Sequence, residues 1–250
     1  MQRFLQLTLW SLLLVIALVP RAWPHADLEL QIEGLTLQLE HQPDNVEWLL
    51  KRGDMQRRHE SPGLARDDFK RVREIQPDNA TVDWFEGRLE VESGHPEIGL
   101  RHLDQFLLAN PDHAIALQNR AKAHLLLHQP LLAAQDYQRV IRVSAKPAPS
   151  LYSSNALALV AAGPEYFSQA MGVVRVGLKR FPGEVSLTGL GTDISLAVAD
   201  TGTAQSLINT LPASILGLPQ WKARLALLNC EAEPSAENCK AAALKKLQDQ

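Results

Sequence analysis

A three-residue motif recurs at equal intervals and constrains the fold of this chain more than any other feature. Pro-Asp-Asn occupies residues 43–45 and 77–79, and Pro-Asp-His occupies residues 111–113. Proline cannot continue a preceding helix, and an Asp or Asn side chain accepts a hydrogen bond from a free amide at the start of the next helix. Each motif therefore predicts a helix end followed by a helix start.

Each 34-residue period also contains a second break, about midway along its length. Proline stands in that break three times, at Pro62, Pro96 and Pro130. Each period is thus predicted to hold two antiparallel helices. Small residues recur where the two helices must approach, and a large apolar residue follows in the second helix. These positions hold Gly53, Gly87 and Ala121 in the first helices, Ala65, Gly99 and Ala133 in the second, and the large residues Phe69, Leu103 and Tyr137.

These features resemble the tetratricopeptide repeat, a 34-residue unit with a Gly or Ala in its first helix, Ala-x-x-x-Phe in its second and a closing Pro. Ala65-x-x-x-Phe69 and Ala133-x-x-x-Tyr137 match directly, whereas the Trp and Tyr positions of the first helix hold other residues. The resemblance implies an all-α fold of helix-turn-helix repeats, stacked as a right-handed TPR-like superhelical solenoid. It also implies that partners bind along the concave wall formed by the first helices.

The pattern divides the chain into four segments. An apolar stripe at every third or fourth residue predicts a helix ahead of the first repeat. Beyond the third repeat the period degrades, but helix pairs continue to the end of the sequence. The segments are a signal peptide or N-terminal anchor (1–26), an N-terminal packing helix (27–42), three TPR-like repeats (43–146), and degenerate TPR-like repeats with a C-terminal capping hairpin (147–250).

The N-terminal segment predicts the location of the protein. A largely apolar run over residues 4–19 follows Arg3 and has the length of a secretory signal, with cleavage expected after Ala26 or Ala22. The alternative is an uncleaved membrane anchor formed by residues 4–19. We therefore expect an exported protein, periplasmic or extracellular. The 25 basic residues do not exceed the 28 acidic ones, so the composition does not favour nucleic-acid binding.

The two cysteines are a further prediction. Cys230 and Cys239 flank a turn near the end of an exported chain and are expected to form a disulfide that joins the last two helices. The alternative is two free thiols in a reducing compartment.

No motif predicts catalysis. The sequence contains no Gly-x-Ser-x-Gly, no Cys-x-x-Cys, no phosphate-binding Gly-rich loop and no His-Glu-x-x-His, so we expect no catalytic residue, no bound metal and no cofactor. His124 and His128 are spaced as two metal ligands on one helix could be. Leucines fill the gap between them, however, and His124 falls where the repeat requires a packed ring, which favours a structural role.

The resemblance, carried over position by position, places six residues in the partner-binding groove of the first helices. They are Arg57, Trp84, Arg88, Lys122, Tyr152 and Asn155. The expected function is a non-enzymatic module that binds a peptide or protein segment, as a scaffold or assembly factor of an envelope or secreted complex. Membrane contact is expected only if the N-terminal segment stays uncleaved. Alternatives are a cofactor-assembly helper that presents apoproteins, and a metal-dependent hydrolase or binder that uses His124 and His128.

Overall fold

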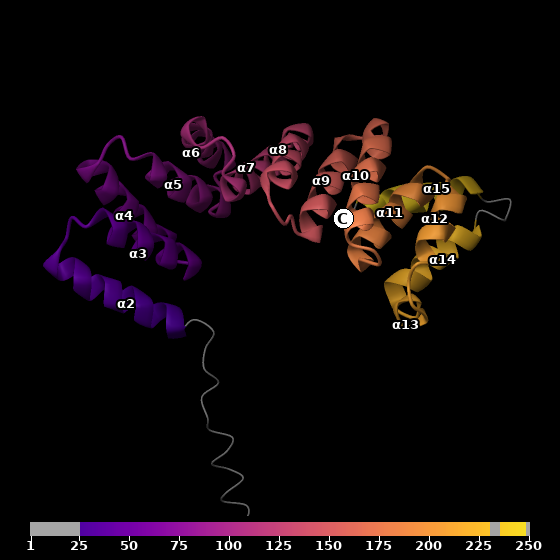
Figure 1. Cartoon of the computed structure of the whole chain (residues 1–250), viewed down its shortest axis with the longest axis horizontal. Helices are drawn as coiled ribbons and strands as arrows, with labels where there is room; N and C mark the ends of the chain where they lie inside the picture. Colours follow the sequence, from indigo (N-terminus) through magenta and orange to yellow (C-terminus); the bar gives the residue numbers. More distant parts are fainter. Residues whose placement is uncertain (1–25, 231–235, 249–250) are drawn as a thin grey trace, which may run out of the picture. The chain divides into compact units, whose positions relative to one another are not determined.

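The computed structural model describes residues 26–230 and 236–248, and all the regular structure in these ranges is helical (Figure 1). The expected all-α fold class of helix-turn-helix repeats is confirmed. The signal or anchor predicted over residues 1–26 lies almost wholly outside the described residues. No helix within the described ranges combines the length and the apolar character that crossing a membrane requires.

A single helix precedes a series of helix pairs, and the pairs alternate a first and a second helix along the chain. The leading helix is α2 (Ala26–His41), which confirms the helix expected ahead of the first repeat. The pairs are α3 (Val46–Arg58) with α4 (Pro62–Ile75), α5 (Ala80–Glu92) with α6 (Pro96–Ala109), α7 (Ala114–Leu126) with α8 (Pro130–Val143), and α9 (Pro149–Ala162) with α10 (Phe167–Arg180). The remaining elements are the 3-10 helix η1 (Pro164–Tyr166), α11 (Val185–Ala197), α12 (Thr201–Ile208), α13 (Ala213–Leu216), α14 (Pro219–Cys230) and α15 (Ala236–Gln248).

The chain forms two compact units that divide within α5, after Phe85. In the first unit, α2 packs on α3 and α3 packs on α4. In the second unit, each helix from α6 to α11 packs against the helix that follows it, so neighbouring hairpins share their faces. Such nearest-neighbour packing is how repeat proteins bury the apolar face that one hairpin cannot cover alone.

The helix boundaries fall where the motifs predict them. The Asn45 side chain accepts a hydrogen bond from the Trp48 amide at 3.1 Å, and His113 Nδ1 accepts one from the Ala116 amide at the same distance. The midway prolines occupy the first positions of α4, α6 and α8, where the missing amide hydrogen would have no helical acceptor in any case. The punctuation of the repeat period is therefore confirmed.

The His113 cap predicts a pH-dependent stability. Burial lowers the pKa of the His113 imidazole below its ordinary value of 6.5, and only the unprotonated Nδ1 accepts from Ala116. The capping contribution is therefore complete above pH 6.5 and is lost as the pH falls through the lowered pKa. His113→Asn, which introduces the residue found at positions 45 and 79, should remove this part of the acid-side loss.

Urea denaturation of the wild type and of His113→Asn on both sides of pH 6.5 measures the effect. The variant should lose less stability than the wild type as the solution is acidified. Because every other histidine is shared by the two proteins, the difference between them isolates residue 113. Parallel pH profiles would contradict a capping role for the unprotonated ring.

The small residues of the first helices lie against the large residues of the second. A Cβ atom on Gly53 would lie 2.4 Å from Phe69 Cε1, and one on Gly87 would lie 2.7 Å from Leu103 Cγ. Both distances are shorter than any ordinary carbon contact, so the backbones can approach this closely only because the side chains are absent. The expected packing of small against large residues is confirmed.

A polar link between the two helices of a hairpin recurs with the same period. Arg52 donates two hydrogen bonds to Asp68, at 2.9 and 2.6 Å, and Arg120 donates two to Asp136 at the same distances. The hydrogen bonds that each guanidinium donates to its carboxylate raise the pKa of that guanidinium, so these pairs stay charged. In these hairpins the first helix carries the base and the second helix carries the acid.

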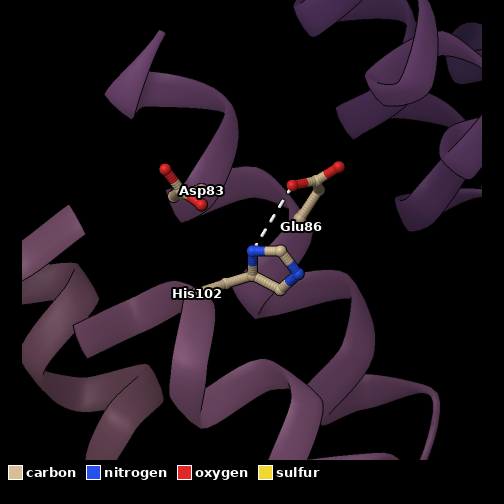
Figure 2. A group of neighbouring side chains, drawn as sticks. All are labelled: Asp83, Glu86 and His102. Atoms are coloured by element: carbon tan, nitrogen blue, oxygen red, sulfur yellow. Dashed lines mark ion pairs between the residues drawn. The ribbon is translucent and has the colours of Figure 1, made fainter. Parts of the chain in front are cut away.

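The hairpin of α5 and α6 contains the same link with acid and base exchanged. Glu86 occupies the position that Arg52 holds in the preceding period, and His102 occupies the position of Asp68. His102 Nδ1 lies 3.4 Å from a Glu86 carboxylate oxygen (Figure 2). The two positions therefore require complementary groups on the two helices, in either order. We call this pair of positions the interhelix link.

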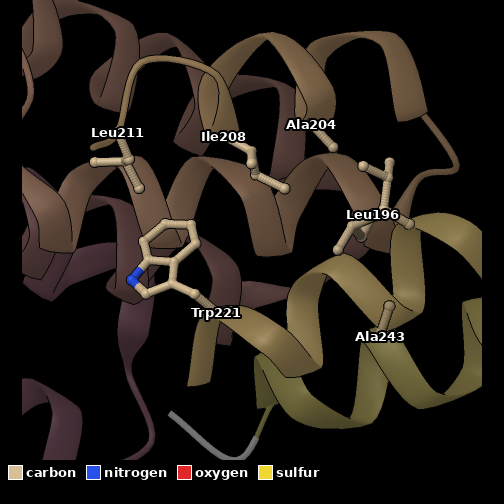
Figure 3. Close-up of a cluster of buried hydrophobic side chains, with 7 residues drawn as sticks. Leu196, Ala204, Ile208, Leu211, Trp221 and Ala243 are labelled. Atoms are coloured by element: carbon tan, nitrogen blue, oxygen red, sulfur yellow. The ribbon is translucent and has the colours of Figure 1, made fainter. Parts of the chain in front are cut away.

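The last helices surround a separate apolar cluster (Figure 3). Trp221 of α14 is fully buried in this cluster, together with residues of α11, α12 and α15. The members are Leu196, Ala204, Ile208, Leu211, Trp221, Leu228 and Ala243. The sequence predicted helices at α11, α12, α14 and α15, whereas the short α13 was not expected.

A buried carboxylate connects these helices. Asp193 of α11 is 1 % exposed. It accepts hydrogen bonds through both oxygens from Arg224 of α14 and a third, at 3.0 Å, from Lys246 of α15. The Arg224 guanidinium also lies 4.7 Å above the Trp221 ring, in cation–π geometry. One acidic group therefore fixes three helices that are distant in sequence.

The predicted disulfide falls at the end of this region. Cys230, the last residue of α14, is disulfide-bonded. Cys239 belongs to α15, but its side chain lies outside the described part of the chain. The pairing of Cys230 with Cys239 stays a prediction.

Candidate functional site

A groove of about 660 Å³ runs between α8 and α10, with α9 as its floor. Its walls come from the second helices of two successive hairpins, and its floor comes from the first helix of the later hairpin. The lining is mostly apolar, with carboxamide groups set into it. The lining includes Gln135, Gln138 and Arg142 on α8, Tyr152, Asn155 and Leu159 on α9, and Gln169, Gly172, Val173 and Val176 on α10.

The floor has its present side chains because the period is broken just before α9. The first helices α3, α5 and α7 begin at equal intervals along the chain, whereas α9 begins at Pro149, one position later than the period predicts. Successive residues of an α-helix are about 100° apart around its axis. One added residue before α9 therefore moves each of its structural positions to the next residue in the sequence. Tyr152 therefore takes the buried place of Leu117, and Asn155 takes the place of Arg120 in the interhelix link.

Helix α10 has no polar side chain at the position that would complete the interhelix link with Asn155. In the second helices, the linking residue stands three places after the small residue, as Asp136 does after Ala133. Ala170 is the corresponding small residue of α10 and is fully buried like Ala133, so the linking position is Val173. A valine side chain neither donates nor accepts a hydrogen bond. The hairpin of α9 and α10 thus has no acid or base at this linking position.

Asn155 places a carboxamide on the floor of the groove. The residue is 3 % exposed and belongs to the groove lining. The similarly buried Asn119 of α7 donates to the Ile115 carbonyl of its own helix at 2.9 Å.

Charge around the groove comes from one residue. Arg142, on the last turn of α8, is the single charged side chain in the lining, and it is exposed and makes no ion pair with the described residues. An arginine is always protonated at physiological pH and presents several donors. The groove is therefore neutral along most of its length and positive beside Arg142.

Two of the six predicted groove residues meet in this groove. Tyr152 and Asn155 both lie on its floor and are nearly fully buried. The Tyr152 ring also contacts the Phe181 ring, with centroids 6.1 Å apart, and it lies where a side chain on Gly177 would clash. Tyr152 therefore shapes the floor, and Asn155 offers it a polar group.

The other four predicted residues lie on three first helices. Arg57 of α3 is mostly buried and pairs with Asp54 at 2.9 Å, and Trp84 of α5 packs its ring 4.7 Å from that of Phe85. Arg88 of α5 is partly exposed, and Lys122 of α7 is exposed. A role for these four residues in partner binding stays a prediction.

The structure does not give His124 and His128 the geometry of a helical ligand pair. Helix α7 ends at Leu126, and His128 adopts a left-handed backbone conformation with φ of 55° in the following turn. His124 is buried, and its Nδ1 lies 2.8 Å from Gln129 Oε1. Four residues of separation place two side chains on one face only within a continuous helix. The expected structural role of His124 fits these contacts.

Sequence reasoning missed the groove walls. Gln135, Gln138 and Arg142 form one stripe of α8, and Gln169, Gly172 and Val176 form one stripe of α10. Both stripes lie on second helices, whereas the family resemblance directs attention to the first helices. The irregular spacing at residues 147–149 was the available signal, because it changes the face that α9 presents.

Comparison with known proteins gives the following relatives. The tetratricopeptide-repeat family model matches residues 86–150. PilF of Pseudomonas aeruginosa is similar in structure, with a TM-score of 0.62 at 17 % identity, over 81 % of this chain and 90 % of PilF. A tetratricopeptide repeat protein of Parabacteroides merdae gives 0.58 at 20 % identity, over 89 % and 86 % of the two chains.

A third similar structure is YrrB, described as a TPR protein with an unusual peptide-binding site. It has a TM-score of 0.60 at 13 % identity, over 72 % of this chain and 91 % of YrrB. No match to this chain was found among curated protein sequences. Residues 86–150 therefore match the tetratricopeptide-repeat model by sequence, and the chain has the fold of a tetratricopeptide-repeat protein.

Proposed function

We propose that this protein is a non-enzymatic interaction module that holds a peptide or protein segment in the groove of α8, α9 and α10. The observation that carries the proposal is the open, mostly apolar groove itself, with the carboxamide of Asn155 on its floor. Tetratricopeptide-repeat proteins act in general through protein–protein contacts, and the fold here is of that kind. Concave apolar sites with a few placed polar groups are typical of ligand binding.

We further propose that the module acts in an exported or envelope complex, as a scaffold or assembly factor. Two observations support this location: the apolar run over residues 4–19 and the disulfide bond of Cys230. Disulfides persist in oxidising compartments and are rare in reducing ones.

The location predicts a measurable covalent state. The protein isolated from its own cells should increase in mass by two hydrogen atoms on reduction, and it should begin after Ala22 or after Ala26. Intact-mass spectrometry with and without reductant checks both points. A mass unchanged by reductant, together with two thiols that react before reduction, would contradict an exported location.

Peptide binding is tested by selection from a displayed library of random peptides on the purified full-length chain. Gly172→Leu should abolish binding of the selected peptides, because a side chain at this position meets nothing within 4 Å and extends into the groove. The same open space means that the variant should fold normally. Arg101→Ala is the matched control, at an exposed basic residue of α6 outside the groove, and it should leave binding unchanged.

The opposite effects of these variants on peptide binding would show that peptides do not bind in the groove. If Lys122→Ala or the double variant Trp84→Ala/Arg88→Ala weakens binding while Gly172→Leu does not, partners bind to the first helices instead. If no peptide is selected, the proposed function itself is contradicted.

A further inference from the structure

We infer that the outer face of α2 binds a cationic amphipathic helix of a partner protein, which covers this face as the first helix of a hairpin would. The inference goes beyond the proposed function, because it assigns a second interaction surface, in the first compact unit and outside the groove. Three features of the described residues carry it: a helix face that the repeat normally buries, two exposed leucines and an excess of acidic residues.

Helix α2 has the register of a second helix, but no first helix precedes it among the described residues. Leu35 stands one 34-residue period before Phe69, and both side chains are buried. Helix α2 packs on α3 as the second helices α6 and α8 pack on the first helices that follow them. It therefore occupies the place of a second helix whose own first helix is missing from the described ranges.

The face that a first helix would cover is exposed on α2. Ala65 and Val72 of α4 are buried, whereas the positions one period earlier hold Gln31 and Gln38, which are exposed. Gly34 lies between these two glutamines, and a Cβ atom on it would meet no atom within 4 Å. A helix of another molecule therefore has room to lie along α2 at this face.

Two leucines border this face. Leu30 is 67 % exposed and Leu37 is 55 % exposed. They lie on one stripe of the helix, because seven residues are close to two turns. The positions equivalent to Leu37 in α4 and α8 hold Arg71 and Arg139, so the repeat does not require a leucine there. Apolar side chains that gather on an exposed helix face indicate contact with another molecule.

Charge selects the chemistry of the occupant. Residues 22–50 include six acidic residues and no lysine or arginine. Four of the six lie on α2, where they are exposed, namely Asp27, Glu29, Glu33 and Glu40. Glu33 and Glu40 are seven residues apart, so they form a row beside the stripe of leucines. Lysine or arginine side chains of a partner would form charge-assisted pairs with this row, whereas acidic side chains would be repelled.

The same charge disfavours two other occupants. A second copy that docked its α2 on this α2 would bring two acidic helices together, and like charges repel. An anionic lipid surface would be repelled for the same reason. A helix with a ridge of apolar residues flanked by lysines or arginines matches both the exposed leucines and the acidic row.

Three designed helical peptides test the inference on the purified full-length chain. They share one leucine ridge and differ only in the flanking residues, which are lysine, glutamine or glutamate. In fluorescence anisotropy, the lysine peptide should bind at least about tenfold more tightly than the glutamine peptide, since several ion pairs form at once. The glutamate peptide should bind most weakly. Added salt should reduce these differences, because it screens exposed charges.

Variants of α2 locate the binding. Leu37→Arg introduces the residue of α4 and α8 and should weaken the lysine peptide at least about tenfold, because a leucine is lost from the contact and a like charge is added. The variant should remain folded by circular dichroism, since the side chain is exposed. Leu108→Arg, at an exposed leucine of α6, is the matched control and should leave binding unchanged. The double variant Glu33→Lys/Glu40→Lys should bind the glutamate peptide more tightly than the lysine peptide.

The remaining outcomes overturn the inference. Equal binding of the three peptides, or equal losses for Leu37→Arg and Leu108→Arg, would contradict it directly. Loss of binding in Gly172→Leu but not in Leu37→Arg would place these peptides in the groove and leave the proposed function intact. A wild-type chain that sediments as a dimer, and as a monomer when it carries Leu37→Arg, would assign the face to a second copy. Binding only by a chain that begins at Asp27 would assign the face to the N-terminal segment.

Discussion

Asp193→Ala should lower the free energy of unfolding by about 3–5 kcal/mol. The change leaves the cationic groups of Arg224 and Lys246 facing a buried site with no anion, and it removes the connection between α11, α14 and α15. Urea denaturation followed by far-ultraviolet circular dichroism measures the loss.

Asp112→Ala is the matched control. Asp112 also pairs with an arginine, Arg139 at 2.9 Å, but its side chain is 64 % exposed. Exposed ion pairs contribute less than about 1 kcal/mol, so this variant should remain close to the wild type. Equal losses for the two variants would show that burial of the Asp193 carboxylate is not what stabilises the C-terminal helices.

Asp136→Ala should produce a smaller loss, about 2–3 kcal/mol of unfolding free energy. Asp136 is nearly fully buried and accepts two hydrogen bonds from Arg120, whose side chain is partly exposed. The expected loss is smaller than at Asp193 because water can still reach the guanidinium that is left behind. Thermal or urea denaturation of the purified chain provides the measurement.

The same arginine supplies the control. Arg120 also donates a hydrogen bond to Asp104 at 2.9 Å, and the Asp104 side chain is 54 % exposed. Asp104→Ala should therefore cost less than about 1 kcal/mol. A loss at Asp104 as large as that at Asp136 would contradict the view that the interhelix link stabilises its hairpin through the buried carboxylate.

The sequence predicts most of the helical architecture because its signals are local. The capping residue Asn45 and the prolines that open α4, α6 and α8 act within one turn of the helix boundary that they define. The small residues at positions 53 and 87 predict the hairpin contacts, since steric exclusion leaves few alternatives there. These features could be assigned without knowing any distant contact.

The C-terminal network could not be predicted in this way. Asp193 meets partners 31 and 53 residues away, and nothing in the local pattern around it distinguishes it from a surface acid. The polar link within the repeats is a different case, because it recurs at the period. Its signal was obscured since the middle hairpin exchanges acid and base, as Glu86 and His102.

The candidate site was predicted only in part, for a geometric reason. Tyr152 and Asn155 were assigned to the groove face of the first helices from the family resemblance. The added residue before α9 rotates that helix, so both side chains lie on the floor between α8 and α10. A shift of one residue changes the face that a helix presents, and the family pattern carries no information about such a shift.

Photo-crosslinking is the measurement that tests the central claim most directly. Benzoylphenylalanine is introduced in place of Gln169, on the groove wall of α10, or in place of Lys122, on the exposed surface of α7, and each full-length protein is irradiated with a selected peptide. Binding in the groove predicts a peptide adduct from position 169, no adduct from position 122, and loss of the adduct in Gly172→Leu. Adducts from position 122 and none from position 169 would contradict binding in the groove.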